Sequence, residues 1–314
     1  MKGIWLENGE FVYRDDLTRP EPARGELLVR TLCTGICGTD LELQRGYYSF
    51  TGVAGHEFVG EVVSDGDQFG KRIVSEINIG CGNCDLCDAG MQNHCATRKV
   101  IGIEQQGGAF AEYLVVPEKN IFSVPEGIAN QHAVLIEPLA AALEILEQVN
   151  PGDYSRVLVI GAGRLGILVA EVLASTTLDV SLLVRRQERL QHIGNPEINV
   201  IDKTLEHDFP LVVETSGQAS GFSTALDSVA ARGTIVMKST YDGQLALDAS
   251  KIVVNELTLV GSRCGPFRKA IDWLQSHSLD HLIFSSHTFK DVGNAFTQAL
   301  DPSVYKVVFE PEQH

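Results

Sequence analysis

The chain has 314 residues, of which 44% are hydrophobic and 21% are charged, an ordinary composition for a globular protein. This length allows two domains, each with its own hydrophobic core. The 41 acidic residues outnumber the 25 basic ones and give a formal charge of −16. That charge opposes binding to nucleic acid or to an anionic membrane, because both require a basic surface.

Near the N-terminus, Glu7 and Glu10 interrupt any apolar run of the length that a secretory signal needs. The longest apolar stretches, such as 157–160 and 167–170, are too short to cross a bilayer. We therefore expect a cytoplasmic protein that binds neither membranes nor nucleic acid.

Short β-like runs punctuated by glycine dominate the first third of the chain. They fall at 26–31, 58–63, 72–76 and 110–116. Since helical periodicity is weak here, the pattern predicts a mostly β domain over residues 1–138.

Three separated segments of this region carry side chains of the kinds that bind zinc. They contain Cys37, His56 with Glu57, and Glu137. A thiolate, an imidazole and a carboxylate suit zinc and leave a coordination position open for water or substrate. A lone cysteine or histidine is more often a packed core residue, so the prediction depends on these segments meeting in space.

Four cysteines crowd into residues 81–95. Cys81, Cys84, Cys87 and Cys95 give the spacing C-x2-C-x2-C-x7-C, which allows four thiolates to surround one zinc ion tetrahedrally. An iron–sulfur cluster and two disulfides are the alternatives. The spacing differs from that of ferredoxins, and no export signal supports disulfides, so we predict a closed, structural zinc site.

The pattern changes around Glu137-Pro138. An alanine-rich apolar stretch with proline near its first turn predicts a helix at 139–149. Beyond it, strands alternate with helical segments, which predicts βαβ units, a parallel sheet and an α/β Rossmann domain over 139–264. The expected strands are 157–160, 180–184, 199–201, 211–214, 234–238 and 257–260, and the expected helices are 165–174 and 187–192. The last segment, 265–314, contains an expected helix at 267–276 and an expected strand at 305–309.

The run from Gly161 to Gly166 fits G-x-G-x-x-G and lies between an expected strand and an expected helix. Gly161 allows a tight turn, Gly163 lets a pyrophosphate approach the backbone, and Gly166 permits close packing of helix on strand. The N–H groups at the helix N-terminus would face the phosphates. We predict a dinucleotide site here in preference to a merely structural glycine turn.

The end of the second strand of this domain distinguishes NAD from NADP. NAD sites usually have an acid there, which binds the ribose 2′-hydroxyl. This strand instead meets Arg185 and Arg186, whose guanidinium groups can bind a 2′-phosphate. We therefore expect NADP(H) to be preferred over NAD(H). The alternative is that both arginines are solvated and Glu188 serves the ribose.

Taken together, these motifs resemble the zinc-containing medium-chain dehydrogenase/reductase family, which includes alcohol, sorbitol, threonine and glucose dehydrogenases. The similar segments follow the family order and are 35–40, 55–60, 81–95, 137–139, 161–166, 214–217 and 256–267. The resemblance implies a GroES-like catalytic domain over 1–138, to which the segment 265–314 returns, beside the Rossmann domain. It also implies a homodimer or homotetramer and, with the cysteine cluster, two zinc ions per chain.

The same resemblance implies roles for the scattered ligand set. Cys37 and His56 are the expected ligands of a catalytic zinc, and Glu57 binds it directly or exchanges with water. Glu137 stands where some alcohol dehydrogenases of the family have a cysteine ligand. Asp40 is the expected acid that orients the zinc-binding histidine.

Thr39 matches the hydroxyl that passes the substrate proton onward. Several relatives complete this relay with a histidine where this chain has Glu42, which either accepts a proton or is a solvated surface acid. Tyr47, Tyr48 and Phe50 follow and either line a substrate pocket or pack within a loop.

On the cofactor side, the resemblance locates segments 238–240 and 261–263 beside the nicotinamide. The full set of expected cofactor residues is Gly161, Gly163, Arg164, Leu165, Gly166, Arg185, Arg186, Ser216, Lys238, Ser262 and Arg263.

The implied reaction moves a hydride between NADP(H) or NAD(H) and a primary or secondary alcohol, a polyol or a sugar hydroxyl, with zinc as a Lewis acid. An aldehyde or ketone reductase working mainly in reverse is one alternative. A non-catalytic structural or regulatory protein that binds a dinucleotide is another, but it would have no need of an open metal site.

Overall fold

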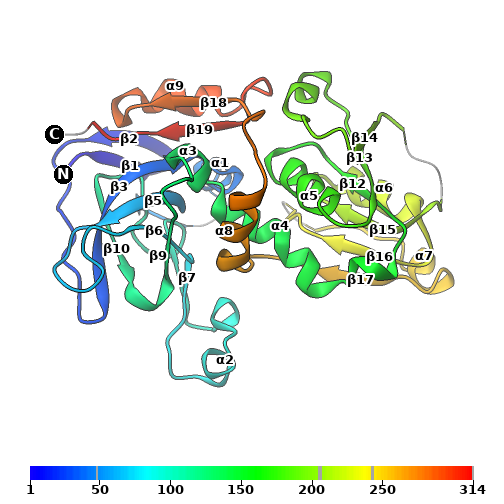
Figure 1. Cartoon of the computed structure of the whole chain (residues 1–314), viewed down its shortest axis with the longest axis horizontal. Coiled ribbons are helices and arrows are strands. Elements are labelled where there is room, and N and C mark those ends of the chain that lie inside the picture. The colour runs from blue at the N-terminus through cyan, green and yellow to red at the C-terminus, as the bar shows by residue number, and fades with distance from the viewer. Residues whose placement is uncertain (47–48, 204–206, 242–243, 313–314) are drawn as a thin grey trace. The chain divides into compact units, whose positions relative to one another are not determined.

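The structure is a computed structural model that describes residues 1–46, 49–203, 207–241 and 244–312 (Figure 1). Contacts divide the chain into two compact units. The β unit comprises Met1–Glu137, Ala270–Leu279 and Phe284–His314, and the α/β unit comprises Pro138–Lys269 and Asp280–Ile283. Of the segment expected to return to the first domain, residues 265–269 and 280–283 therefore group with the α/β unit instead.

The β unit contains a seven-stranded sheet in which six strands follow the order β11-β6-β5-β3-β19-β18 and β10 pairs with β3. Its strands are β3 (Glu26–Gly35), β5 (Glu57–Val62), β6 (Arg72–Ser75), β10 (Tyr113–Pro117), β11 (Ile121–Ser123), β18 (Phe284–His287) and β19 (Lys306–Phe309). Two strands from distant parts of the chain thus flank β3. Gly35 at the end of β3 pairs with Glu57 of β5 on one side and with Val308 of β19 on the other.

Two three-stranded sheets and several short helices complete this unit. The strands are β1 (Gly3–Glu7), β2 (Glu10–Arg14) and β4 (Gly52–Val53) in one sheet, and β7 (Asn78–Ile79), β8 (Lys99–Ile101) and β9 (Gln105–Gln106) in the other. The helices are α1 (Gly38–Gln44), α2 (Asp85–Asp88), α3 (Asn130–Ala133), α9 (Val292–Gln298) and the 3₁₀ turns η1 (Gln92–His94), η2 (Glu118–Asn120) and η5 (Phe289–Asp291).

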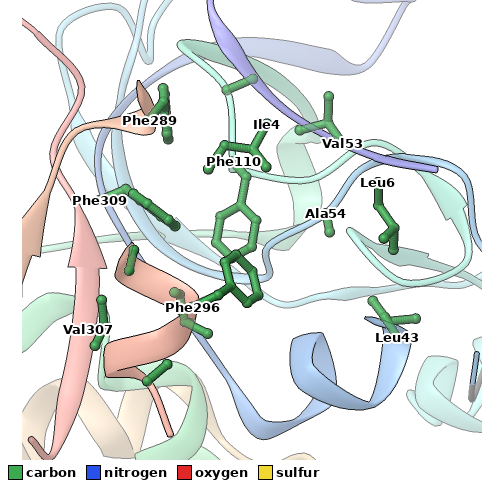
Figure 2. Packing of buried hydrophobic residues seen from close by; sticks show 14 of the residues in the cluster. Ile4, Leu6, Leu43, Val53, Ala54, Phe110, Phe289, Phe296, Val307 and Phe309 are labelled. Atoms are coloured by element: carbon green, nitrogen blue, oxygen red, sulfur yellow. The ribbon is translucent and has the colours of Figure 1, made fainter. Parts of the chain in front are cut away.

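An aromatic cluster holds the N-terminal and C-terminal parts of the β unit together. Figure 2 shows the Phe110 ring at its centre, between Phe296 of α9 and Phe309 of β19. The ring centroids of Phe110 lie 6.3 Å and 5.4 Å from these two rings, in edge-to-face geometry. Each such pair contributes about 0.5–1.5 kcal/mol beyond the burial of its area. A Cβ atom on Gly55 would lie 2.4 Å from Phe110, so glycine is required directly before His56.

The α/β unit is built on a parallel sheet with the strand order β14-β13-β12-β15-β16-β17. Its strands are β12 (Arg156–Ile160), β13 (Asp179–Leu183), β14 (Ile198–Ile201), β15 (Phe209–Glu214), β16 (Val229–Met237) and β17 (Thr258–Gly261). Numbered within the unit this order is 3-2-1-4-5-6, the Rossmann order, whose switch point lies between β12 and β15. The expected fold class, a mostly β domain with a Rossmann domain, is therefore confirmed.

Helices α5 and α6 pack on this sheet, α5 against β12, β13 and β14, and α6 against β12, β15 and β16. The helical elements that begin in or belong to this part of the chain are α4 (Ile136–Gln148), α5 (Arg164–Ala174), α6 (Ala219–Ser228), α7 (Ala249–Val254), α8 (Phe267–Ser276), η3 (Pro151–Asp153) and η4 (Gln187–His192). Proline lies inside the first turn of α4, as the sequence predicts. Within the described ranges, no helix has the length and apolar character needed to span a bilayer.

Candidate active site

Cys37, His56 and Glu57 meet at the end of β3. Gly35 pairs with Glu57 in the sheet, so Cys37, two residues after Gly35, lies close to Glu57 of β5 and to His56 directly before it. One potential ligand atom from each of the three side chains lies within 4.8 Å of the others. His56 and Glu57 are buried, whereas Cys37 is partly exposed.

The turn after β3 holds Cys37 and Thr39 in place. Cys37 is the N-cap of α1, and its backbone N–H donates a hydrogen bond of 2.8 Å to the Asp40 carboxylate. The Thr39 hydroxyl lies 3.7 Å from Cys37 Sγ. The hydroxyl expected to carry the substrate proton is therefore beside the candidate metal ligands.

The other oxygen of Asp40 faces the histidine. Asp40 Oδ1 lies 3.6 Å from His56 Nδ1, and both side chains are buried. This contact leaves Nε2 of His56 as the nitrogen for a metal. Burial raises the pKa of Asp40 to about 6, although the neighbouring His56 acts against this shift.

The group carries excess negative charge. Burial alone would lower the pKa of His56, but Asp40, Cys37 and Glu137 outweigh it and hold that pKa well above its ordinary value. Glu137, in the first turn of α4, lies outside the set whose ligand atoms fall within 4.8 Å of one another, although its charge acts on His56. This set of sulfur, nitrogen and oxygen donors fits a zinc ion, whose positive charge would compensate the negative charge of the surrounding groups.

Sequence reasoning missed Lys306. This lysine of β19 is 1% exposed, and its ammonium group donates to Glu57 Oε2, which is also 1% exposed, and to the backbone carbonyl of Ile36 at 3.4 Å. The ion pair uses Oε2 of Glu57, and the second oxygen of Glu57 takes no part in it. The signal in the sequence was a single charged residue inside the apolar strand expected at 305–309.

The four cysteines of the lobe, residues 81–95, also converge. The Sγ atoms of Cys81 and Cys87 are 4.0 Å apart, and those of Cys84 and Cys95 are 3.9 Å apart. Zn–S bonds of about 2.3 Å give tetrahedral edges of about 3.8 Å, whereas a disulfide requires about 2.05 Å. The backbone N–H of Cys81, together with Thr97, lowers the pKa of Cys95 to about 6, which favours a thiolate. The set fits a tetrahedral zinc.

A cavity of about 400 Å³ opens at the switch point of the parallel sheet. It is lined from the carboxyl ends of β12, β13 and β15, and the residues expected there that do line it are Gly161, Gly163, Arg185, Arg186 and Ser216. Arg164, Leu165, Gly166, Lys238, Ser262 and Arg263 are not among its lining residues. Lys238 and Ser262 meet each other, with Nζ donating to the Ser262 hydroxyl at 3.0 Å.

Arginines dominate one wall of this cavity. Arg185 donates to the hydroxyls of Ser220 and Thr224 on α6, at 3.4 and 3.1 Å. Arg186 and Arg189 also line it, and its described lining residues include no acid. Glu188, the alternative ribose ligand, is exposed and outside the lining. The sequence analysis missed Arg189, although its position three residues after Arg186, in the helix expected at 187–192, could have indicated it.

The sequence also makes Glu42 a candidate for the proton path and Phe50 a candidate for a substrate pocket. Glu42 is partly exposed and accepts a hydrogen bond of 2.7 Å from Arg45, as a surface acid does. Phe50 packs against the aromatic cluster of the β unit. Tyr47 and Tyr48 lie outside the described residues.

The chain resembles known proteins in sequence over most of its length. Residues 23–126 match the alcohol dehydrogenase GroES-like domain. The chain is 30% identical to the starvation-sensing protein RspB of Escherichia coli K12 over 312 residues, which cover 92% of both proteins. It is 31% identical to the L-threonine 3-dehydrogenase of Shewanella sp. strain ANA-3 over 285 residues, covering 83% of this chain and 81% of that enzyme.

Solved structures extend the likeness to the whole chain. The alcohol dehydrogenase RspB of Escherichia coli CFT073, in complex with NADH, shares 28% identity, with a TM-score of 0.88 and 99% coverage of both chains. A zinc-binding dehydrogenase of Sinorhizobium meliloti 1021, bound to NADP, shares 26% identity with the same TM-score and coverage.

These comparisons confirm the expected GroES-like domain and an NAD(P)-dependent oxidoreductase of the alcohol and polyol dehydrogenase type. The non-catalytic alternative is thereby set aside. The chain belongs to the zinc-containing medium-chain dehydrogenase/reductase family.

Proposed function

We propose that this enzyme interconverts an alcohol, polyol or sugar hydroxyl and the corresponding carbonyl with NADP(H), and that it binds two zinc ions per chain. The catalytic ligands are Cys37 and His56 with Glu57 or Glu137, and the structural ligands are the four cysteines of the lobe. The observation that carries the proposal is the convergence of Cys37, His56 and Glu57 from separate segments to within 4.8 Å.

In this mechanism a zinc ion, when bound, supplies a Lewis acid that favours the ionised form of a substrate hydroxyl. Thr39 accepts the substrate proton and passes it toward solvent, because its hydroxyl lies beside Cys37. Asp40 orients the His56 ring through Nδ1. Lys306 pairs with Glu57 Oε2 and so fixes the position of this side chain in its buried setting. The dinucleotide, when bound, would supply the nicotinamide that exchanges a hydride with the substrate carbon.

Metal analysis combined with a cysteine substitution tests this proposal. The purified protein should contain about two zinc ions per chain. Cys37→Ala should reduce this to about one and lower the turnover at least about a hundredfold, because an open metal site has lost a ligand. Cys33→Ala is the matched control, since Cys33 is a buried thiol of β3 whose pKa is raised by burial, outside both ligand sets.

If Cys37→Ala keeps its zinc and its turnover, the catalytic assignment is wrong. A panel of alcohols, polyols and aldoses, assayed through reduced nicotinamide absorbance, identifies the substrate class and the favoured direction. Faster reduction of aldehydes or ketones across the panel would favour the reductase alternative.

The preference for NADP(H) is supported by the arginine wall. A 2′-phosphate is negatively charged, and guanidinium groups bind such a group through two hydrogen bonds. A 2′-hydroxyl requires a hydrogen-bond acceptor, and the described lining residues include no carboxylate that could serve as one. Relatives of this chain have been crystallised with NADH and with NADP, so the wall itself carries the argument.

Calorimetric titration should therefore show NADPH binding more tightly than NADH. Arg186→Ala and Arg189→Ala should each reduce that preference about tenfold, the effect of losing one charge-assisted contact. Arg232→Ala is the control, because Arg232 is exposed and does not line the cavity. Equal affinities for both cofactors in the unaltered protein would contradict the preference.

A homodimer through the edge of the parallel sheet is the proposed assembly. Strand β17 is an edge strand, and in α7, which precedes it in the chain, Val253 and Val254 are 75% and 79% exposed. An edge strand with exposed apolar side chains favours pairing with a second copy. In light scattering, Val253→Lys with Val254→Lys should shift the mass toward the monomer, whereas Val200→Lys on the opposite edge strand β14 should not. A monomeric unaltered protein would contradict the proposal.

A further inference from the structure

Glu214, the last residue of β15, has a fully buried carboxylate that receives three hydrogen bonds. The Ser216 backbone N–H donates to Oε1 at 2.7 Å, and the Ser216 hydroxyl donates to the same oxygen. The Tyr241 hydroxyl donates to Oε2. All three donors are neutral, so the carboxylate is satisfied by hydrogen bonds alone, at the cost of its desolvation.

These bonds connect two loops at the carboxyl ends of neighbouring strands. We call residues 215–218 the β15 loop and residues 238–241 the β16 loop. Thr215, Ser216 and Gln218 of the β15 loop line the dinucleotide cavity. A second bond, from the Gly217 N–H to the Ser239 hydroxyl at 2.8 Å, joins the same loops. The wall of the cavity is thus supported from the β16 side.

The β15 loop also lies against the glycine turn with no spare room. The Thr215 hydroxyl donates to the carbonyls of Ile160 and Gly161 at 2.9 and 3.0 Å. A Cβ atom on Gly161 would lie 2.9 Å from Ser216 Cα, and one on Gly221 would lie 1.9 Å from Ser216 Oγ. Any shift of Ser216 therefore changes the surface that meets the dinucleotide.

We propose that Glu214 is a positioning residue for the dinucleotide, which fixes the β15 loop against the glycine turn and uses Tyr241 as its anchor in the β16 loop. It acts through Ser216 and does not itself line the cavity. Burial and the hydrogen bond to Glu214 raise the pKa of Tyr241, so its hydroxyl remains a donor across the working range of pH. The inference rests on the proposed dinucleotide site but not on the choice between NADP and NAD.

Tyr241→Phe removes one donor and tests the proposal with a matched control. Tyr154, which precedes β12 in the same unit, shares a hydrogen bond of 3.0 Å with Thr234 of β16, and neither residue lines the cavity. By calorimetric titration, Tyr241→Phe should raise the Kd of NADPH and of NADH by about tenfold, the effect of losing a bond to a charged group. Tyr154→Phe should change neither Kd by more than about twofold, and neither variant should alter KM for the alcohol.

Glu214 variants sharpen the test. In Glu214→Gln, the amide oxygen still accepts from Ser216, and the amide N–H can donate to the Tyr241 oxygen, so most of the affinity should return. Glu214→Leu should weaken binding more than tenfold, and adding Tyr241→Phe to it should cause no further loss, because both changes remove the same support.

Unchanged Kd values in Tyr241→Phe and Glu214→Leu would overturn this inference alone. So would losses of affinity that follow the fall in Tm equally in Tyr241→Phe and Tyr154→Phe, since that result indicates a purely structural role. Failure of the unaltered protein to bind either dinucleotide would overturn the proposed function together with this inference.

Discussion

The two candidate metal centres are built in opposite ways. The cysteine lobe takes its four thiolates from the 15 residues 81–95, where short turns and α2 suffice to bring them together. The second centre needs β5 and β19 to flank the end of β3, and its Lys306–Glu57 pair joins residues 249 positions apart. A local centre depends on turn chemistry, whereas a dispersed centre depends on the whole sheet being in register.

The two centres should also differ in how strongly their perturbation lowers the free energy of unfolding. The dispersed centre contains a buried ion pair, and removing one partner of such a pair typically costs 3–5 kcal/mol. Cys81, Cys84 and Cys87 of the lobe are at least partly exposed, Cys81 most of all, and the two Sγ–Sγ distances match the edges of a tetrahedron. Perturbing the dispersed centre should therefore affect fold and chemistry together, and perturbing the lobe should affect stability alone.

The largest effect should come from Lys306→Met, which leaves the Glu57 carboxylate buried without its cation. We expect the free energy of unfolding to fall by about 3–5 kcal/mol in denaturant titrations, and the turnover to fall with it. Lys306→Arg, which keeps the charge, is the control and should recover a large part of both. A loss below about 1 kcal/mol would mean that the pair does not hold the dispersed centre together.

A smaller effect is expected from Cys84→Ser in the lobe. One thiolate is lost from a closed site, so about one zinc ion per chain should be released and the unfolding free energy should fall by roughly 2–4 kcal/mol. The kcat of the folded fraction should stay within about twofold, because this site has no open position for substrate. Loss of kcat in proportion to the released zinc would remove the distinction between the two centres.

The smallest effect should come from Glu42→Gln. This side chain forms a surface ion pair with Arg45, which is 66% exposed, and such pairs contribute less than about 1 kcal/mol. Turnover and Tm should remain close to those of the unaltered protein. A fall in turnover of more than about tenfold, with a shifted pH profile, would instead make Glu42 part of the proton path and extend the dispersed centre to α1.

Sequence reasoning predicted best what consecutive residues determine. The glycine turn at 161–166 follows β12 and opens α5, as its spacing indicates, and the strands of the parallel sheet begin within a few residues of their expected positions. The helix expected at 139–149 is α4, which starts earlier, at Ile136, because proline occupies its first turn.

What the sequence could not supply were partners that only the tertiary fold brings together. The importance of Lys306 and Tyr241 comes from their contacts with Glu57 and Glu214. These partners are 249 and 27 positions away along the chain. Glu137 shows a further limit, since its motif suggests a metal ligand, whereas the structure leaves it outside the group of three whose ligand atoms lie within 4.8 Å of one another. Distances of that size are decided by packing rather than by spacing along the chain.

The interior location of β19, between β3 and β18, has a consequence for biosynthesis. Ribosomes release a chain from its N-terminus, so residues 81–95 emerge 211 positions before residue 306 does. The lobe would be complete while translation continues. Glu57, by contrast, can form its ion pair with Lys306 only after β19 has left the exit tunnel and paired with β3. The four ligands of the proposed lobe site are therefore synthesised before the last contact of the dispersed centre, in an order fixed by the sequence.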